Sequence, residues 1–361
     1  MKVLFACGGT GGHIYPAIAI ADEIMKRDEN AGILFVGAKG KIEEKIVPDN
    51  GFELKTITIK GLDRKNFFKN ITLPIKILGA VKDCRKIIRE FGPDVAIGTG
   101  GYSSLPAIYA ASKMGIPTLI QGGDSYPSKV TKFLSKYVSR VVINFEETRA
   151  HLKRKENIIR FSHPVRASLS RVSKEEAYEL FGLDSGKRTL FIFGGSQGAK
   201  GINEAVENII DKLREMNINI IWQTGKTDFD RLHEKYNDDS QDVKVYEFIE
   251  HIGHAYSIAD LVVCRAGISS IMELSTLGLA ALLIPYPFAA ENHQEKNART
   301  IERAKAGLVL EQNELKEKLF ETIQSTLSND VLLNEMRENI RQFSDPQAAE
   351  KIADEALKLV A

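Results

Sequence analysis

The stretch LFACGGTGG, residues 4–12, returns in the second half of the chain as LFIFGGSQG, residues 190–198. Each copy consists of an apolar run, two adjacent glycines, a hydroxyl residue and a further glycine, and a helix-like pattern follows. Such a run is typical of a buried β-strand that turns sharply into a helix. A single repeat at a separation of 186 residues predicts a duplicated domain rather than a solenoid.

Short apolar runs alternate with longer amphipathic stretches over most of the chain. The predicted helices include Leu73–Phe91 and Pro16–Arg27, with Pro16 at the first helical position, where its missing N–H costs nothing. This alternation predicts an α/β fold with doubly wound parallel sheets. The predicted strands of the first half are Val3–Cys7, Ile33–Gly37, Leu54–Ile59, Val95–Gly98, Thr118–Gln121 and Arg140–Ile143.

The length of 361 residues favours two domains. We predict a first domain over residues 1–163 and a second over residues 164–345, because the strand and glycine-loop pattern restarts beyond this boundary. Residues 346–361 are expected to form a last helix that packs back on the first domain.

The two halves of the chain differ in charge. Residues 1–160 carry 26 Lys/Arg and 16 Asp/Glu, whereas the remaining 201 residues carry 23 Lys/Arg and 32 Asp/Glu. The opposite net charges of the two halves predict two domains that face different partners. The basic half lacks aromatic stacking patterns and DNA or RNA motifs, so we expect no nucleic-acid partner.

The cysteines and the apolar runs favour a cytoplasmic protein. Cys7, Cys84 and Cys264 are far apart and lack CxxC spacing, which is typical of reduced thiols rather than disulfides or zinc ligands. No run approaches the roughly 20 apolar residues of a membrane span, and the start is too short for a signal peptide.

The first glycine loop resembles a dinucleotide fingerprint only in part. Aligning G-x-G-x-x-G on Gly9 and Gly11 puts Ile14 in place of the third glycine. The second strand ends in Gly37-Ala38 rather than in an acid that would hold a ribose hydroxyl. A nicotinamide enzyme is therefore disfavoured. The loop's backbone N–H groups and the helix start could still face an anion.

The second glycine loop also fits the G-x-S-x-G nucleophile elbow of hydrolases. Ser196 would be the nucleophile, and Asp260 and His293 follow it in the right order. In the alternative interpretation, Ser196 donates its hydroxyl to a phosphate. Asp228-Phe229-Asp230 matches a metal-binding DxD, but acids there are more often the start of a helix. His251 and His254 share a helical face without a third ligand nearby, so we expect no metal site.

The stretch from Cys264 to Glu273 is more informative. A predicted strand, Asp260–Cys264, ends in a glycine turn and opens a helix that carries two serines. A pyrophosphate could lie on the helix start, with Glu273 about one turn further on to accept hydrogen bonds from a ribose diol. Taken alone, Glu273 is more often a solvated helix acid. The polar cluster Glu291–Asn297 follows the next strand and is dense in groups that could bind sugar hydroxyls.

These motifs together resemble the MurG family, the peptidoglycan N-acetylglucosaminyltransferases that convert lipid I to lipid II. The resemblance covers nearly the whole chain and implies the GT-B fold, with two Rossmann-like domains and an interdomain cleft, and no metal or other cofactor. Six blocks match in order and spacing: Gly8–Pro16, Gly100–Pro106, Pro164–Arg166, Gly194–Ala199, Cys264–Glu273 and Asn292–Asn297.

The resemblance implies that the second domain binds UDP-GlcNAc. Glu273 would contact the uridine ribose, and Ile249 would lie beside uracil. Ser196 and the helix start after Gly267 would take the pyrophosphate. The other positions implied as donor contacts are Thr10, Gly11, Gly12, Arg166, Gln197, Ile268, Ser269, Gln294 and Asn297.

One block departs from the family pattern. The family's His-Glu-Gln-Asn segment before a proline is here Gln121-Gly122-Gly123-Asp124, followed by Ser125-Tyr126-Pro127. The family's asparagine helps to recognise the donor. Asp124 therefore puts the contact to the acetamido group, and the donor selectivity, in question.

His13 is the candidate catalytic residue. We expect it to point from the glycine loop into the cleft, near the anomeric carbon. There it could take a proton from the acceptor hydroxyl, or stabilise the leaving pyrophosphate as a cation. In the alternative interpretation, the ring only caps the loop by hydrogen bonding.

The first domain carries a candidate membrane segment. Between Lys60 and Glu90, nine Lys/Arg and three acids are interleaved with apolar residues that include Phe67 and Phe68. This pattern predicts contact with an anionic membrane on its cytoplasmic face, and we place Tyr102 on the same acceptor side. A helix that buries its apolar face in the core would account for the residues from Leu73 onward, but less well for the two phenylalanines.

The resemblance therefore implies an inverting, metal-independent transferase. It would move GlcNAc from UDP-GlcNAc to the MurNAc C4 hydroxyl of lipid I in peptidoglycan synthesis. The alternatives are a related transferase that acts on another lipid such as diacylglycerol, a serine hydrolase that uses Ser196, and a non-catalytic nucleotide-sugar binder.

Overall fold

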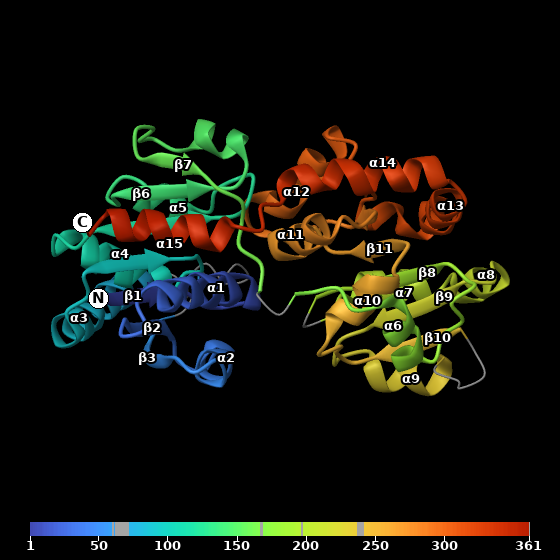
Figure 1. Ribbon diagram of the computed structural model, residues 1–361, viewed down its shortest axis with the longest axis horizontal. Helices are drawn as coiled ribbons and strands as arrows, with labels where there is room; N and C mark the ends of the chain where they lie inside the picture. The colour runs from blue at the N-terminus through green and yellow to red at the C-terminus, as the bar shows by residue number, and fades with distance from the viewer. Residues whose placement is uncertain (60, 62–71, 167–168, 196–197, 237–241, 361) are drawn as a thin grey trace. The chain divides into compact units, whose positions relative to one another are not determined.

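The computed structural model describes residues 1–59, 61, 72–166, 169–195, 198–236 and 242–360. The chain divides into two compact units (Figure 1). The first unit comprises Met1–Arg166 and Asp345–Ala361, and the second unit comprises Ala167–Ser344. The divisions predicted from the sequence, after residues 163 and 345, lie within three residues of these positions.

The described residues of the first unit form a parallel sheet of seven strands in the order β3-β2-β1-β4-β5-β6-β7. All six predicted strands are present, with ends that differ by at most two residues. The strands are β1 Lys2–Ala6, β2 Gly32–Ala38, β3 Glu53–Ile57, β4 Val95–Gly98, β5 Thr118–Gly122, β6 Arg140–Ile143 and β7 Ile158–Arg160.

Apolar side chains cover both faces of this sheet. Successive side chains of a strand point to opposite faces, so Leu4 of β1 lies in one buried cluster and its neighbour Phe5 lies in another. Helices cover both clusters, as expected for a parallel sheet. They are α1 Gly11–Arg27, α2 Glu43–Asp49, α3 Leu73–Phe91, α4 Ser104–Lys113, α5 Lys129–Leu134, the 3-10 helix η2 Glu146–His151 and α15 Ala348–Lys358.

Helix α1 begins five residues earlier than predicted, so Pro16 lies inside it rather than at its first position. The chain turns into the helix directly at the glycines, and the His13 N–H already bonds to the Thr10 carbonyl at 3.1 Å. Pro16 then removes only the hydrogen bond to the Gly12 carbonyl, close to the start of the helix.

The last helix of the chain, α15, packs on the first unit (Figure 1). Ile352, Ala353 and Ala356 of this helix are buried in the same cluster as the inner face of α1. Arg27 of α1 also pairs with Asp354, with 2.7 Å between Nε and Oδ1. The C-terminal segment therefore completes one layer of the first unit.

The second unit repeats this plan with a parallel sheet of six described strands in the order β10-β9-β8-β11-β12-β13. Its strands are β8 Thr189–Phe193, β9 Asn219–Gln223, β10 Val243–Tyr246, β11 Leu261–Cys264, β12 Ala281–Leu283 and β13 Leu308–Val309. Its helices are α6 Lys174–Phe181, α7 Lys200–Glu207, α8 Ile210–Glu215, α9 Phe229–Tyr236, α10 Ile252–Ile258, α11 Ile268–Leu277, η3 Ala290–Asn292, α12 His293–Arg303, η4 Gln312–Glu314, α13 Leu315–Leu327, α14 Asp330–Ile340 and η5 Arg341–Phe343. The predicted α/β fold with two doubly wound units is thereby confirmed.

The repeated sequence stretch occupies the same place in both sheets. Strand β1 lies between β2 and β4, and strand β8 lies between β9 and β11. In each sheet the strand order therefore reverses beside the repeated stretch. Ligands of open parallel sheets bind outside the carboxyl ends of the strands at such a reversal. The glycines that follow β1 and β8 thus lie at the ligand-binding edge of their own sheets.

Candidate functional site

The first glycine loop is folded around a buried carboxylate. Glu43, at the start of α2, accepts the Gly9 N–H at 3.1 Å and the Ala38 N–H at 2.9 Å, and it is fully buried. Gly8 has a φ of +151°, and a Cβ on it would overlap the Glu43 carboxylate. The Gly9 N–H is therefore not available to an anion, whereas the predicted donor contacts of Thr10, Gly11 and Gly12 stay predictions.

Glu43 was not predicted as a site residue, because nothing in its local sequence distinguishes it from an exposed acidic residue on a surface helix. Its burial and its two backbone partners arise only when the turn after β1 meets the turn after β2. It also acts on its neighbours, since burial and the Glu43 charge together raise the pKa of Tyr102.

The loop after β4 closes over the first glycine loop and holds His13. Ser103 Oγ donates to the Cys7 carbonyl at 3.0 Å, and Thr99 Oγ1 donates to the His13 carbonyl at 2.6 Å. A Cβ on Gly100 would lie 2.5 Å from His13 Nδ1, so only glycine leaves space for the ring. His13 is half-buried in the first turn of α1, with one edge against this glycine backbone.

Arg166 and Asp124 lie in segments of the same unit. The Arg166 guanidinium stands over the ring of Tyr15, 4.7 Å from its centroid, and Tyr15 follows His13 by two residues in α1. Asp124 is half-buried, and Thr148 Oγ1 donates to its carbonyl at 3.1 Å. Helix α1 thus carries Gly11, Gly12 and His13 and also supports Arg166.

In the second unit, Glu273 is a buried residue of α11 rather than a solvated helix acid. It is 6% exposed, and Tyr256 of α10 donates its hydroxyl to Glu273 Oε2 at 3.0 Å. This tyrosine fixes one oxygen of the carboxylate. Burial, with a smaller contribution from the Glu273 charge, raises the pKa of Cys264.

The turn between β11 and α11 has the composition of an anion site. Gly267 caps α11, which begins at Ile268, so the N–H groups of the first turn lack partners within the helix. Ser269 Oγ is buried and has no hydrogen-bond partner within the described part of the chain. Such a hydroxyl at a helix start can donate to a bound anion.

Gln294 and Asn297 of α12 approach this turn from the other side. Asn297 is fully buried and donates to the Ala266 carbonyl at 3.4 Å, so it supports the turn. Gln294 Oε1 accepts the Tyr286 N–H at 2.9 Å. Its Nε2 lies 4.0 Å from the position of a Cβ on Gly267. The structure therefore brings Gln294 and Asn297 together with the start of α11.

Ile249 lies elsewhere in the same unit. It follows β10, the edge strand, which is three strands away from β11, about 14 Å at ordinary strand spacing. Its N–H donates to Gln223 Oε1 at 3.0 Å, and its side chain is buried. Four other predicted residues, Ser196, Gln197, Phe67 and Phe68, lie outside the described residues.

Arg265 is a structural residue of this site that the sequence analysis missed, although a charge at the end of a buried strand is unusual. Its Nη1 donates to the carbonyls of Ile284 and Pro285, at 3.2 and 3.1 Å, and its Nη2 donates to Gln312 Oε1 at 2.6 Å. Burial lowers its pKa to about 10. Arg265 therefore ties the turn after β11 to the segment that precedes α12.

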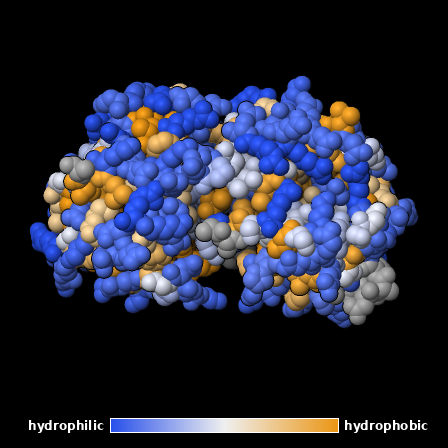
Figure 2. All heavy atoms as spheres, viewed as in Figure 1, coloured by the Kyte–Doolittle hydropathy of each residue, from blue (hydrophilic) through white to orange (hydrophobic). Residues whose placement is uncertain are grey.

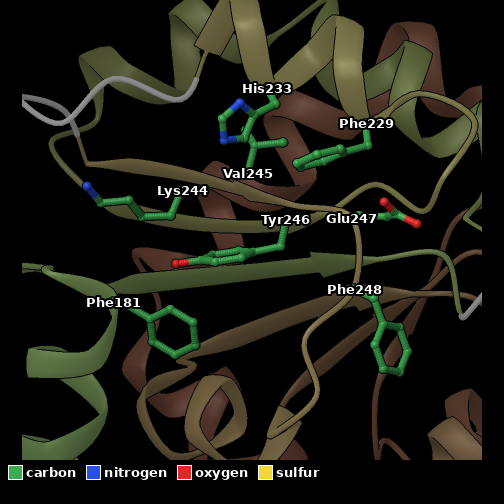
Figure 3. Close-up of a pocket in the computed structure, with 8 residues that line it drawn as sticks. All are labelled: Phe181, Phe229, His233, Lys244, Val245, Tyr246, Glu247 and Phe248. Carbon is green, nitrogen blue, oxygen red and sulfur yellow. The ribbon is translucent and has the colours of Figure 1, made fainter.

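A pocket of about 490 Å³ lies along the edge strand β10 (Figure 3). Phe229 and His233 of α9 lie on one side of the strand, and Phe181 of α6 lies on the other. The pocket adjoins Ile249 through Phe248, which is 50% exposed, but neither Glu273 nor the α11 turn lines it. The remaining lining residues are Lys244, Val245, Tyr246 and Glu247.

The geometry disfavours the hydrolase interpretation. Asp260 precedes β11 at the amino end of the strand, where it accepts the Thr189 N–H at 2.9 Å and pairs with Arg337 at 3.1 Å. The glycines that precede Ser196 lie at the opposite, carboxyl end of the sheet. Asp260 therefore cannot orient a histidine beside that loop.

Two of the candidate metal ligands, Asp228 and His254, have structural partners. Asp228 accepts a hydrogen bond from Asn203 Nδ2 at 2.8 Å and lies 3.6 Å from Arg231. His254 lies 3.4 Å from Glu176. The contacts of Asp228 explain the start of the DxD sequence as a residue that holds the beginning of α9 in place.

The comparisons with known proteins agree with this architecture. Residues 3–143 match the glycosyltransferase family 28 N-terminal domain, and residues 189–352 match the C-terminal domain of that family. An N-acetylglucosamine transferase from Thermoanaerobacter sp. strain X514 is 41% identical over 357 residues, which are 98% of each chain. One from Christiangramia forsetii is 41% identical over 100% of this chain and 98% of its own.

Both relatives are named UDP-N-acetylglucosamine--N-acetylmuramyl-(pentapeptide) pyrophosphoryl-undecaprenol N-acetylglucosamine transferase. The crystal structure of Acinetobacter baumannii MurG is similar to this chain with a TM-score of 0.78 and 28% identity, over 99% of both chains. The two Rossmann-like units are those of the GT-B fold. The chain belongs to glycosyltransferase family 28 and, within it, to the MurG family of N-acetylglucosamine transferases.

Proposed function

We propose that the protein transfers GlcNAc from UDP-GlcNAc to the MurNAc C4 hydroxyl of lipid I, which yields lipid II for peptidoglycan synthesis. The observation that carries this proposal is the 41% identity to transferases named for this reaction, over 98% of the chain. A related transferase for another lipid, a nucleotide-sugar binder or a hydrolase would not account for that full-length match.

The second unit holds the nucleotide part of the donor in this proposal. The Glu273 carboxylate, one oxygen of which accepts the Tyr256 hydroxyl, also accepts hydrogen bonds from the ribose hydroxyls in this proposal. The start of α11, with Ser269 Oγ, binds the pyrophosphate. The positive end of a helix and a buried hydroxyl that has no partner among the described residues both favour an anion there. Gln294 and Ile249 are assigned to the sugar and the uracil, respectively.

The reaction is a single displacement at the anomeric carbon. The acceptor oxygen forms the new bond to C1 as the bond from C1 to the UDP oxygen breaks, so the configuration inverts. The acceptor proton goes to His13, and the electron pair of the broken bond leaves with UDP. A general base of this kind contributes about 10²–10⁴-fold in rate. The half-buried ring of His13, held beside Gly100, is suited to this role.

The first unit faces an anionic membrane in this proposal, on its cytoplasmic side. Ile75 and Leu78 of α3 are 72% and 69% exposed, and Lys76 and Lys82 lie on the same helix. Hydrophobic side chains also gather on the surface over α4, which packs on α3 (Figure 2). Exposed apolar residues among lysines favour the surface of an anionic bilayer. Among the described residues, no helix is long and apolar enough to cross a bilayer.

The donor assignment is tested by Glu273→Gln. The amide keeps the size of the side chain but loses the charge, and a hydrogen bond to a charged group contributes about 1.5–3 kcal/mol. We expect UDP to bind at least about tenfold more weakly by calorimetry. Glu317→Gln, which changes an exposed acid of α13, is the matched control and should bind UDP normally. Equal UDP affinity in both variants would remove Glu273 from the donor site.

The reaction itself is tested by UDP release from UDP-GlcNAc. Release that requires a lipid I analogue, with one GlcNAc transferred for each UDP, supports the proposed transferase. A protein that only binds the nucleotide sugar would release no UDP. A hydrolase would show release without an acceptor, together with labelling by a fluorophosphonate probe.

A further inference from the structure

A buried polar pair links two segments of the first unit. Gln121, at the end of β5, and His163, beyond β7, are each 3% exposed, and Gln121 Nε2 lies 2.8 Å from His163 Nδ1. The His163 N–H donates to Asn144 Oδ1 at 3.0 Å, which fixes the backbone at this point. The pair therefore joins residues that are 42 positions apart in the chain.

Each member of the pair keeps an unused polar atom. Gln121 Oε1 and His163 Nε2 are buried and have no hydrogen-bond partner within the described ranges. A neutral imidazole has one donor and one acceptor, so the ring and the amide can bond in two arrangements. In either arrangement, the second ring nitrogen and part of the amide stay without a partner among the described residues. Because buried polar groups without partners cost free energy, two apolar side chains of similar size would stabilise the fold better.

The position of the pair points to a role other than stability. Gln121 precedes Asp124 by three residues, and His163 precedes Arg166 by three residues. Both Asp124 and Arg166 are candidate donor contacts. Gly122 and Gly123 stand between Gln121 and Asp124, so no bulky side chain restricts this part of the segment. An anchor at Gln121 therefore limits how far Asp124 can move.

Burial keeps His163 in one protonation state. Burial, with a smaller contribution from His13, lowers the pKa of His163 to about 3. The ring is therefore neutral at physiological pH and holds the amide by an uncharged hydrogen bond.

We propose that Gln121 and His163 form a positioning pair that fixes the spacing between Asp124 and Arg166 and thereby sets the selectivity for the sugar of the donor. This inference rests on the proposed function. Neither residue touches the donor in this proposal. The pair acts through the two segments that it joins.

The experiment compares variants that remove the polar atoms but keep the approximate size of the side chains with one variant that exchanges the two residues. They are Gln121→Met, His163→Phe, the double variant, and an exchange variant that combines Gln121→His with His163→Gln. The measured quantity is the ratio of kcat/KM for UDP-GlcNAc to kcat/KM for UDP-glucose. UDP affinity by calorimetry and the melting temperature are measured in parallel.

We expect each single variant to lower the selectivity ratio about tenfold while the UDP affinity stays within a factor of about two. The double variant should be no worse than either single variant, because both remove one shared interaction. The exchange variant should restore at least part of the ratio.

Asn157→Leu is the matched control. Asn157 is a buried amide of the same unit that donates to the carbonyls of Ser135 and Val138, and its Oδ1 also lacks a partner among the described residues. This change should lower the melting temperature and leave the ratio unaltered.

Two results would overturn the inference: an unchanged ratio in folded single variants, or losses that multiply in the double variant. If a single variant fails to fold, Gln121→Asn, which keeps the amide but shortens its reach, must lower the ratio instead. A wild-type protein that transfers no GlcNAc would refute the proposed function itself. An active wild type with an unchanged ratio would refute only the positioning role.

Discussion

Acid should destabilise the first unit through His163. In the folded protein, burial first and His13 second lower the pKa of this ring from 6.5 to about 3. Between these two values, the unfolded chain binds a proton that the folded chain does not. Stability is therefore fully present above pH 6.5 and is lost as the pH falls toward 3, by up to about 1.4 kcal/mol for each pH unit.

The expected loss follows from integrating this proton difference. Between about pH 7.5 and about pH 5, an unfolded histidine of ordinary pKa takes up nearly one proton, and the free energy of unfolding falls by about 2 kcal/mol. Most carboxylates titrate below this range, so histidines dominate the change, and a variant that lacks His163 separates the share of this ring from that of the other six histidines. His163→Gln removes the titrating group and keeps a polar partner for Gln121.

The assay is urea unfolding at both pH values, followed by pulse-labelling hydrogen exchange of peptides from β4, β5 and β6. Fluorescence of Trp222, which is buried in the second unit, reports that unit separately. Wild type should lose about 2 kcal/mol in the first unit, and His163→Gln should lose only a small part of that amount. A variant that keeps the full wild-type loss would show that His163 is not the group responsible.

Three further predictions concern the reaction and the membrane. His13→Ala should lower kcat by about 10²-fold or more with nearly unchanged UDP affinity, and wild-type turnover would leave His13 with the capping role alone. Asp124→Asn should raise the selectivity for UDP-GlcNAc over UDP-glucose, because an amide can donate to the acetamido oxygen whereas an ionised carboxylate only accepts; a lower ratio would identify Asp124 itself as the acetamido contact. Replacing Ile75 and Leu78 by serine should weaken binding to anionic vesicles about tenfold or more in co-sedimentation, since both side chains are exposed; wild type that ignores such vesicles would contradict the membrane assignment.

The local pattern of the sequence was sufficient to predict the two parallel sheets. Alternating apolar runs and amphipathic stretches give the parallel α/β plan, since strand and helix periodicity are properties of neighbouring residues. The repeated glycine stretch also located β1 and β8, the strands beside which each sheet reverses its order. The sequence also predicted a glycine turn and a helix start ahead of Glu273, because these residues lie within ten positions of one another, whereas the donor role of Glu273 stays a prediction.

Contacts between segments that are distant in the sequence could not be predicted from any local pattern. Glu43 binds the Gly9 N–H across 34 residues, and Gln121 binds His163 across 42 residues. Asp260 stands in a plausible order for a triad, yet the strand direction puts it at the amino end of β11. Periodicity and spacing determine which residues form an element and which face they occupy. Which side chains meet depends on strand order and register, and these are settled only when the whole sheet is assembled, because burial then selects the pairs that can satisfy their hydrogen bonds.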